Sequence, residues 1–178
     1  LFYDRMQLEI PNEYFALFDY LQSKDPAKRI VHLPSYNFWG WQFNDWGYRG
    51  SGFLWYGIEQ PIVDRNFDTW GPTNESLYLE LDYALKNQEP NQLSDIFQKY
   101  DISYVLIDKS ISHPNVSSET DLIQQQLKQV LAAGGQIEWQ QDSLILLAMP
   151  INSKSSFVSA ELNPAMVNYN IVNTRKDV

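Results

Sequence analysis

The sequence predicts an α/β fold, a mixed-sheet sandwich with helices, followed by the truncated start of a β-sandwich domain. Up to residue 149, segments with a helical repeat of apolar residues alternate with short β-branched segments. After Pro150 the polar linker INSKSS leads into two segments of alternating polarity, Phe157–Leu162 and Met166–Val172. We therefore predict an α/β domain over residues 1–151, and a linker with the first strands of a second domain over residues 152–178.

The first third of the chain contains one predicted helix and two predicted strands. Asn12–Ser23 repeats apolar side chains every three or four positions, and the preceding Pro11 favours a helix start. Arg29–Leu33, RIVHL, is typical of a short buried strand, and Pro34 ends it. Gln60–Arg65 is a second candidate for a short strand.

The middle of the chain predicts two helices and the most apolar strand. Leucines in Ser76–Lys86 alternate as they would in a strand, but the composition and the cap residues Thr73 and Asn74 favour a helix. Gln92–Tyr100 has apolar residues at i, i+3, i+4 and i+7, which indicates a second helix. It leads directly into Ile102–Asp108, ISYVLID, a β-branched strand.

The last part of the α/β domain predicts a helix and then a hairpin. Glu119–Ala133 carries an apolar stripe, and Gly134 has the conformational freedom that a helix end requires. Gln136–Gln140 and Ser143–Met149 are strand-like and lie only two residues apart, which predicts an antiparallel pair.

The charge and composition exclude several classes of protein. A net charge of −9 and a pI of about 4.6 repel nucleic-acid phosphate, so we predict no nucleic-acid partner. Such acidity is also unusual for a cytoplasmic membrane-protein loop, where Lys and Arg are in excess. No apolar run approaches the roughly 18 residues that span a bilayer. The chain opens on Leu1 without Met, and we expect both ends to be cuts within a longer protein.

Few residues are suited to metal, cofactor or covalent chemistry. With no cysteine and only His32 and His113, a transition-metal site is not expected, and we predict neither metal nor cofactor. His32 lies in an apolar strand, where a hydrogen-bonded core histidine is expected. The glycines of GYRGSG lack the Lys-Ser/Thr of a phosphate loop. Four carboxylates near the aromatic segment leave a hydrolytic pair open as an alternative: Asp45, Glu59, Asp64 and Asp68.

The candidate binding region is an aromatic segment over residues 36–58, which we predict to be a long ordered loop containing short strands. Ten of the 21 residues in Tyr36–Tyr56 are aromatic, far above the 15% of the whole chain. Flat rings beside polar groups suit the apolar faces and hydroxyl edges of sugars. Burial of most rings in the core is the main role that we expect, and a glycan-binding surface and a belt at a membrane interface are the alternatives. The candidate platforms are Trp39, Trp41, Trp46, Tyr48 and Trp55, and the candidate hydroxyl-binding groups are Gln42, Asn44, Asp45 and Arg49.

Three segments together resemble a known family. They are IPNEYFALFDYLQSKDPAKRIVHLP, LSDIFQKYDISYVLIDKS and SAELNPAMVNYNIVNTR, in that order. They are similar to the soluble part that follows the last membrane helices of GT-C-type glycosyltransferase-like proteins, including the YfhO-like proteins. The resemblance implies an α/β domain before a β-sandwich, outside the cytoplasmic membrane. It places the catalytic carboxylate in an early membrane loop that no position here matches.

The resemblance leads to a first hypothesis and leaves two alternatives. The chain is expected to be a non-catalytic extracytoplasmic domain of a multi-pass membrane protein in cell-envelope glycan assembly. Its expected partners are its own transmembrane region and a glycan or lipid-linked glycan. The alternatives are a structural or protein-interaction module and a carbohydrate-active hydrolase with paired carboxylates.

Overall fold

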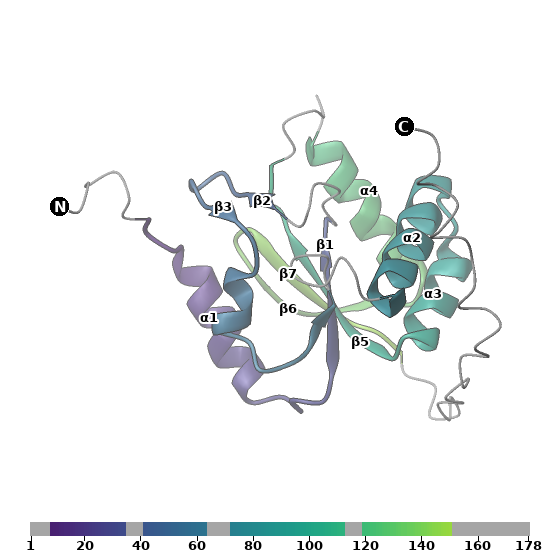
Figure 1. Cartoon of the computed structure of the whole chain (residues 1–178), viewed down its shortest axis with the longest axis horizontal. Coiled ribbons are helices and arrows are strands. Elements are labelled where there is room, and N and C mark those ends of the chain that lie inside the picture. Colours follow the sequence, from purple (N-terminus) through teal and green to yellow (C-terminus); the bar gives the residue numbers. More distant parts are fainter. Residues whose placement is uncertain (1–7, 35–40, 64–71, 113–118, 151–178) are drawn as a thin grey trace, which may run out of the picture.

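A five-stranded mixed sheet with helices on both faces forms the centre of the computed structural model, which describes residues 8–34, 41–63, 72–112 and 119–150 (Figure 1). The strand order is β4-β1-β5-β7-β6. β4 and β5 are parallel to β1, whereas β7 is antiparallel to β5 and β6. The predicted mixed sheet is therefore confirmed. The strands are β1 (Arg29–Leu33), β4 (Ile62–Val63), β5 (Ile102–Asp108), β6 (Gln136–Gln141) and β7 (Leu144–Ala148).

The largely apolar segment ISYVLID forms the central strand β5. All of its residues are buried, because helices cover both faces of the sheet at this position. Its register with β1 pairs Leu33 with Ile107, so the carboxyl ends of the two parallel strands meet at one edge of the sheet. Asp108, the last residue of β5, is thereby brought to the end of β1.

The helices divide the core into two halves. α1 (Asn12–Gln22) and the 3₁₀ helix η2 (Phe53–Tyr56) pack on one face of the sheet, while α2 (Pro72–Asn87), α3 (Pro90–Lys99) and α4 (Glu119–Ala132) cover the other (Figure 1). Alternate residues of β5 pack into the two halves of the core, because successive side chains of a strand point to opposite faces. Val105 and Ile107 join the α2–α3–α4 side, and Leu106 joins the α1 side.

The predicted elements are confirmed with shifts at their ends. The ambiguous leucine-rich segment is helical and starts earlier, at Pro72. The strand expected over Gln60–Arg65 is confined to two residues within its described part. Gly134 has the expected positive φ of 97°, and Gly135 donates its N–H to the carbonyl of Val130, as in a Schellman helix end. No helix of the described residues is long and apolar enough to cross a membrane.

The described part of the aromatic segment is ordered around a second, two-stranded sheet. β2 (Gln42–Phe43) and β3 (Arg49–Gly50) are antiparallel, with Gly47 at a φ of 101° in their turn. We call residues 41–57, which comprise β2, β3 and η2, the aromatic hairpin. The expected loop with short strands is thus confirmed here. Residues 35–40 and the predicted second domain at 152–178 lie outside the described residues.

Close packing between η2 and α1 gives a test of the hairpin's position. A Cβ at Gly57 would lie 2.4 Å from ring carbons of Phe18, so Gly57→Ala forces the helix and hairpin apart. We expect a loss of about 1–3 kcal/mol in the free energy of unfolding, measured by urea denaturation. Tyr56→Ala, at a neighbouring side chain that is 93% exposed, is the control and should change it by less than about 0.5 kcal/mol. Equal effects of the two variants would contradict the described packing.

Candidate functional site

A buried carboxylate lies beneath the aromatic hairpin, at the carboxyl end of β5. Asp108 has no exposed surface. Its Oδ2 accepts a 2.6 Å hydrogen bond from the Tyr14 hydroxyl, and its Oδ1 accepts bonds from the Ser110 N–H at 2.9 Å and hydroxyl at 2.7 Å. Burial of a carboxylate is costly unless such donors surround it. The turn after β5 and helix α1 supply these donors.

The aromatic hairpin joins the same network. Asn44 Nδ2 donates to Ser110 Oγ at 2.7 Å and to the Tyr14 hydroxyl at 3.2 Å, and Trp46 Nε1 also donates to that hydroxyl at 3.2 Å. Backbone bonds reinforce the contact, since the Asp45 N–H donates to the Ser110 carbonyl at 2.8 Å. Side chains from α1, the hairpin and the end of β5 therefore meet at one buried point. We call Tyr14, Asn44, Asp108 and Ser110 the polar anchor.

Burial dominates the ionisation of this cluster. Loss of solvent raises the pKa of Asp108, and the hydrogen bonds from Tyr14 and Ser110 oppose that rise only in part. The pKa of the Tyr14 hydroxyl is also raised, first by burial and then by the nearby charge of Asp108. Tyr14 is thus a neutral donor at every physiological pH.

His32 is a core histidine, as its place in an apolar strand predicts. It is 3% exposed, and its Nδ1 lies 3.0 Å from Gln42 Nε2. Its Nε2 lies 3.9 Å from Asp108 Oδ2, beyond hydrogen-bond distance. The ring therefore links β1 to the hairpin on the sheet side of the polar anchor.

Above the anchor, four rings pack edge to face and stack. Trp46 stacks on Tyr48 with 5.6 Å between centroids and 23° between planes. Phe53 contacts both at 5.5 and 4.7 Å, and Tyr14 meets the edge of Trp46 at 5.6 Å. Such contacts add to the stabilisation that ring burial gives. Trp46 and Tyr48, both predicted as sugar platforms, therefore form much of the packed base of the hairpin.

The other candidate residues lie on the outside of the hairpin. Trp41 is 48% exposed and precedes β2, and Trp55 is 41% exposed on η2. Asp45, in the β2–β3 turn, and Arg49, on β3, are also exposed. Trp39 lies outside the described residues. The hairpin is thus half core and half surface, and its exposed half carries two indole rings with one residue of each charge.

Two polar residues expected to bind hydroxyls are not at the surface. Gln42 is 4% and Asn44 5% exposed, and both side chains bond to protein groups beneath the hairpin. Both were predicted to bind sugar hydroxyls, whereas here these polar residues of the β-ribbon close its buried face, where their partners lie. In their place, the sequence reasoning missed Asp108. Its position at the end of a β-branched, largely apolar strand was the available signal.

The polar anchor connects α1, the aromatic hairpin and the end of β5. Asp108 is enclosed by protein donors, and the described residues contain no group of three or more His, Cys, Asp or Glu side chains that could hold a metal ion. Of the carboxylates proposed for a hydrolytic pair, Asp45 and Glu59 are exposed, while Asp64 and Asp68 lie outside the described residues. That pair stays an untested alternative.

Comparison with solved structures identifies a segment of similar fold in a much larger protein. The matching chain is the arabinofuranosyltransferase AftD of mycobacteria. Its cryo-EM structure aligns with 81% of this chain at a TM-score of 0.56 and 14% identity, and the match spans 12% of AftD. A mutant form of AftD aligns over the same share of this chain at a TM-score of 0.57 and 15% identity, spanning 13% of that chain.

These similarities are of fold, since no family model and no curated protein sequence matches this chain. The segment of similar fold belongs to an arabinofuranosyltransferase, which agrees with the resemblance to glycosyltransferase-like proteins seen in the sequence. The chain spans about one eighth of AftD, so AftD's activity as a whole does not transfer to it directly.

Removing Trp46 tests whether it is part of the hairpin's base. We expect Trp46→Ala to lower the free energy of unfolding by about 2 kcal/mol, less than for a fully buried tryptophan, because the ring is half-buried. Chemical denaturation measures the change. Trp41→Ala is the matched control and should cost less than about 0.5 kcal/mol. If Trp46→Ala is as mild as Trp41→Ala, the ring does not pack as described.

The pH dependence of stability tests the burial of Asp108. Because its pKa is raised in the folded state, that state binds the proton more tightly than the unfolded chain, whose Asp pKa is about 3.9. This contribution to stability is complete below about pH 4 and is lost as pH rises toward the folded pKa. Asp108→Asn removes it, so wild type should lose unfolding free energy relative to the variant between about pH 4 and pH 7.

Urea unfolding at several pH values in that window measures the difference between the two proteins. A constant offset between them, caused by altered hydrogen bonding, does not affect this test. Asp45→Asn, at an exposed carboxylate, is the control and should follow the wild-type profile. If the unfolding free energies of wild type and Asp108→Asn change with pH in the same way, the Asp108 carboxyl has the same pKa in the folded and unfolded states, and the predicted rise is wrong.

Proposed function

We propose that this chain is an extracytoplasmic domain of a multi-pass membrane protein that takes part in cell-envelope glycan assembly. The observation that carries the proposal is the alignment of 81% of the chain with a segment of AftD at a TM-score of 0.56. Because the polar anchor is enclosed and structural, the domain itself is non-catalytic in this proposal. The rest of the parent protein supplies the chemistry and is the domain's first partner.

The charge of the chain supports a location outside the cytoplasmic membrane. A net charge of −9 is opposite to the Lys and Arg excess of cytoplasmic loops. The acidic surface also disfavours close contact with anionic lipid headgroups. In the full-length gene product we expect several apolar segments of about 20 residues, and their absence would overturn the membrane part of the proposal.

The exposed half of the aromatic hairpin is the proposed glycan contact. Trp41 and Trp55 offer apolar ring surface, and Asp45 and Arg49 offer an acceptor and donors for sugar hydroxyls. The packed base beneath them keeps the surface rigid, which lowers the entropy that ordering on binding costs. The same exposed rings are the surface of the alternative, a module that docks a partner protein.

The name of the similar enzyme suggests which glycan to test first. AftD is an arabinofuranosyltransferase, so an oligosaccharide of arabinofuranose residues is the first probe for this chain. The chemistry of the hairpin does not select one neutral sugar over another. A panel that includes a hexose oligosaccharide of equal length therefore separates glycan binding in general from preference for pentofuranose.

The test is an NMR titration of the 178-residue chain with these oligosaccharides. We expect shifts of amide signals across residues 41–57 and of the indole signals of Trp41 and Trp55. Trp41→Ala and Trp55→Ala should each reduce affinity about tenfold, since stacking on one ring contributes of the order of 1–2 kcal/mol. Neither variant should change the unfolding free energy by more than about 1 kcal/mol, because both rings are partly exposed.

Tyr83→Ala is the matched control, because Tyr83 is 59% exposed on α2, on the opposite side of the sheet. It should leave oligosaccharide binding unchanged. Lack of binding by the wild-type hairpin to any of the oligosaccharides would refute the glycan contact and favour the protein-docking alternative. Hydrolysis of the probe by the isolated chain would refute the non-catalytic role.

A further inference from the structure

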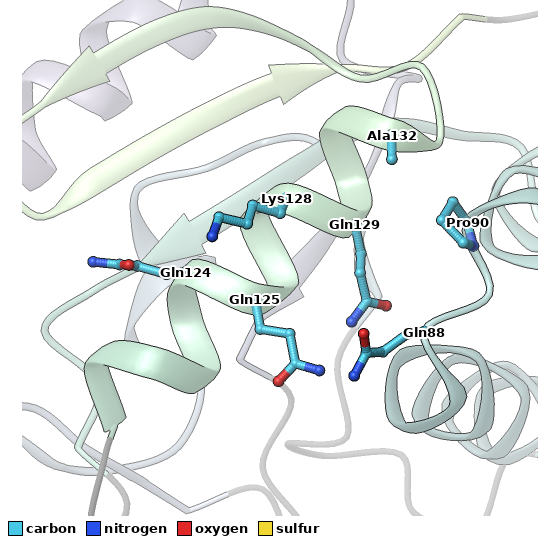
Figure 2. Close-up of a pocket in the computed structure, with 7 residues that line it drawn as sticks. All are labelled: Gln88, Pro90, Gln124, Gln125, Lys128, Gln129 and Ala132. Atoms are coloured by element: carbon cyan, nitrogen blue, oxygen red, sulfur yellow. The ribbon is translucent and has the colours of Figure 1, made fainter.

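A pocket lined by glutamines lies between α4 and the turn that joins α2 to α3. Its volume is about 540 Å³, within the usual range of small-molecule sites. Figure 2 shows Gln125 and Gln129 projecting from one side of α4 toward the segment that carries Gln88. Lys128 and Gln124 complete the polar lining. No described element of the aromatic hairpin contributes to it.

The lining has an unusual chemistry for a ligand site. The side chains that line such sites are mostly apolar with a few polar groups, whereas here five of the seven described lining residues carry a carboxamide or an ammonium group. A carboxamide is uncharged and offers two donors and one acceptor oxygen. It can therefore bond to a hydroxyl in either direction and can bridge neighbouring hydroxyls. Among the described residues of the lining there is no carboxylate that would attract a metal ion.

Gln129 forms the inner wall of the pocket. It is 6% exposed, and its Nε2 donates at 3.1 Å to the carbonyl of Leu85 near the end of α2. Its Oε1 is buried and accepts no hydrogen bond from the described residues. A buried acceptor without a donor is costly, so this oxygen is a ready partner for a ligand hydroxyl. The exposed side chain of Gln88 points toward the Gln129 carboxamide in Figure 2, so the hydroxyls of one ligand can bond to both amides.

Gln88 occupies a backbone position that favours glycine. Its φ is 56°, and it ends α2 in a Schellman motif, with its own N–H donating to Leu85 and that of Glu89 to Ala84. α4 ends in the same motif, but with Gly134 in the equivalent position. At the rim of the pocket, the side chain of Gln88 is therefore present at a strained backbone position. Strained residues of this kind are concentrated at functional sites.

We propose that this pocket binds a neutral polyhydroxylated ligand, a short saccharide, through the carboxamides of Gln88, Gln125 and Gln129. The hydroxyls of the sugar donate to Gln129 Oε1 and exchange hydrogen bonds with the other two amides. None of the described residues that line the pocket is aromatic, so we expect a weak affinity, roughly millimolar. The site extends the proposed role in glycan assembly, because it supplies a second contact for a glycan chain.

The two saccharide sites are independent in structure. The pocket belongs to the α2–α3–α4 side of the sheet and the aromatic hairpin to the α1 side (Figure 1). Binding at one can therefore fail while binding at the other persists. Signals from the two regions separate the outcomes within a single titration.

The test is an NMR titration of the 178-residue chain with a neutral pentose oligosaccharide, followed through the side-chain amide signals of its glutamines. We expect shifts of the Gln88, Gln125 and Gln129 signals. Gln88→Gly should weaken binding at this pocket about fivefold, the effect of one lost hydrogen bond. It should also raise the midpoint of thermal unfolding by roughly 2–4 °C, because glycine relieves the strained φ. A loss of binding in a variant that is more stable than wild type cannot result from unfolding.

Gln140→Ala, at an exposed glutamine of β6, is the matched control and should change neither quantity. Unchanged binding by Gln88→Gly, or shifts confined to the aromatic hairpin, would overturn the proposal while leaving the hairpin contact intact. Glucuronate and inorganic phosphate are tested in parallel. If these anions perturb the pocket and the neutral sugar does not, Lys128 alone recognises charge and the proposed amide recognition is wrong.

Discussion

The requirement to satisfy one buried carboxylate organises the half of the molecule that carries the aromatic hairpin. Asp108 ends the most buried strand of the sheet and has no access to water. Its oxygens must therefore be satisfied by protein donors, and Tyr14 and Ser110 provide them. Removing one partner of such a buried group costs more than an ordinary hydrogen bond contributes. The positions of α1 and of the turn after β5 are coupled for this reason.

The same buried carboxylate also determines the position of the aromatic hairpin. It has only two short strands paired with each other, too few to be stable alone. Asn44 and Trp46 reach down to the hydroxyls that contact Asp108, and the rings of Tyr48 and Phe53 close over them. A segment that contains no long helix or strand is thereby attached to α1 and to the turn after β5. Its outer residues are presented to solvent on a fixed base.

The two faces of the sheet differ in how they could meet a ligand. On the α1 side, Gln42 and Asn44 are buried beneath the hairpin. The rings are divided, because Trp46 packs in the base whereas Trp41 and Trp55 are exposed. On the α2–α3–α4 side, the described pocket is lined by amides, with the helix end at Gln88 shaping its rim. An accessory domain that contacts a glycan chain at two separated places gains effective concentration from the link between them. Two sites of weak individual affinity are then sufficient to hold the chain.

The repeat of apolar residues determined most of the fold. Helix and strand periods, turn glycines and the β-branched run of β5 correctly predicted the order of elements, because each depends on local geometry and on burial of one face. The family resemblance agreed with the fold-level similarity to AftD. The mixed sheet could be predicted as well, since two strands separated by two residues can only pair antiparallel.

The sequence could not determine which side of the aromatic segment faces the core. Trp41 and Trp46 have the same side chain and lie five residues apart, yet one is exposed and the other packs on Tyr14. That difference depends on residues about 30 and 60 positions away, Tyr14 on α1 and Ser110 after β5, which the tertiary fold brings to the hairpin. Local patterns fix the elements, whereas buried hydrogen-bond partners distant in sequence decide which polar groups and rings are left for a ligand.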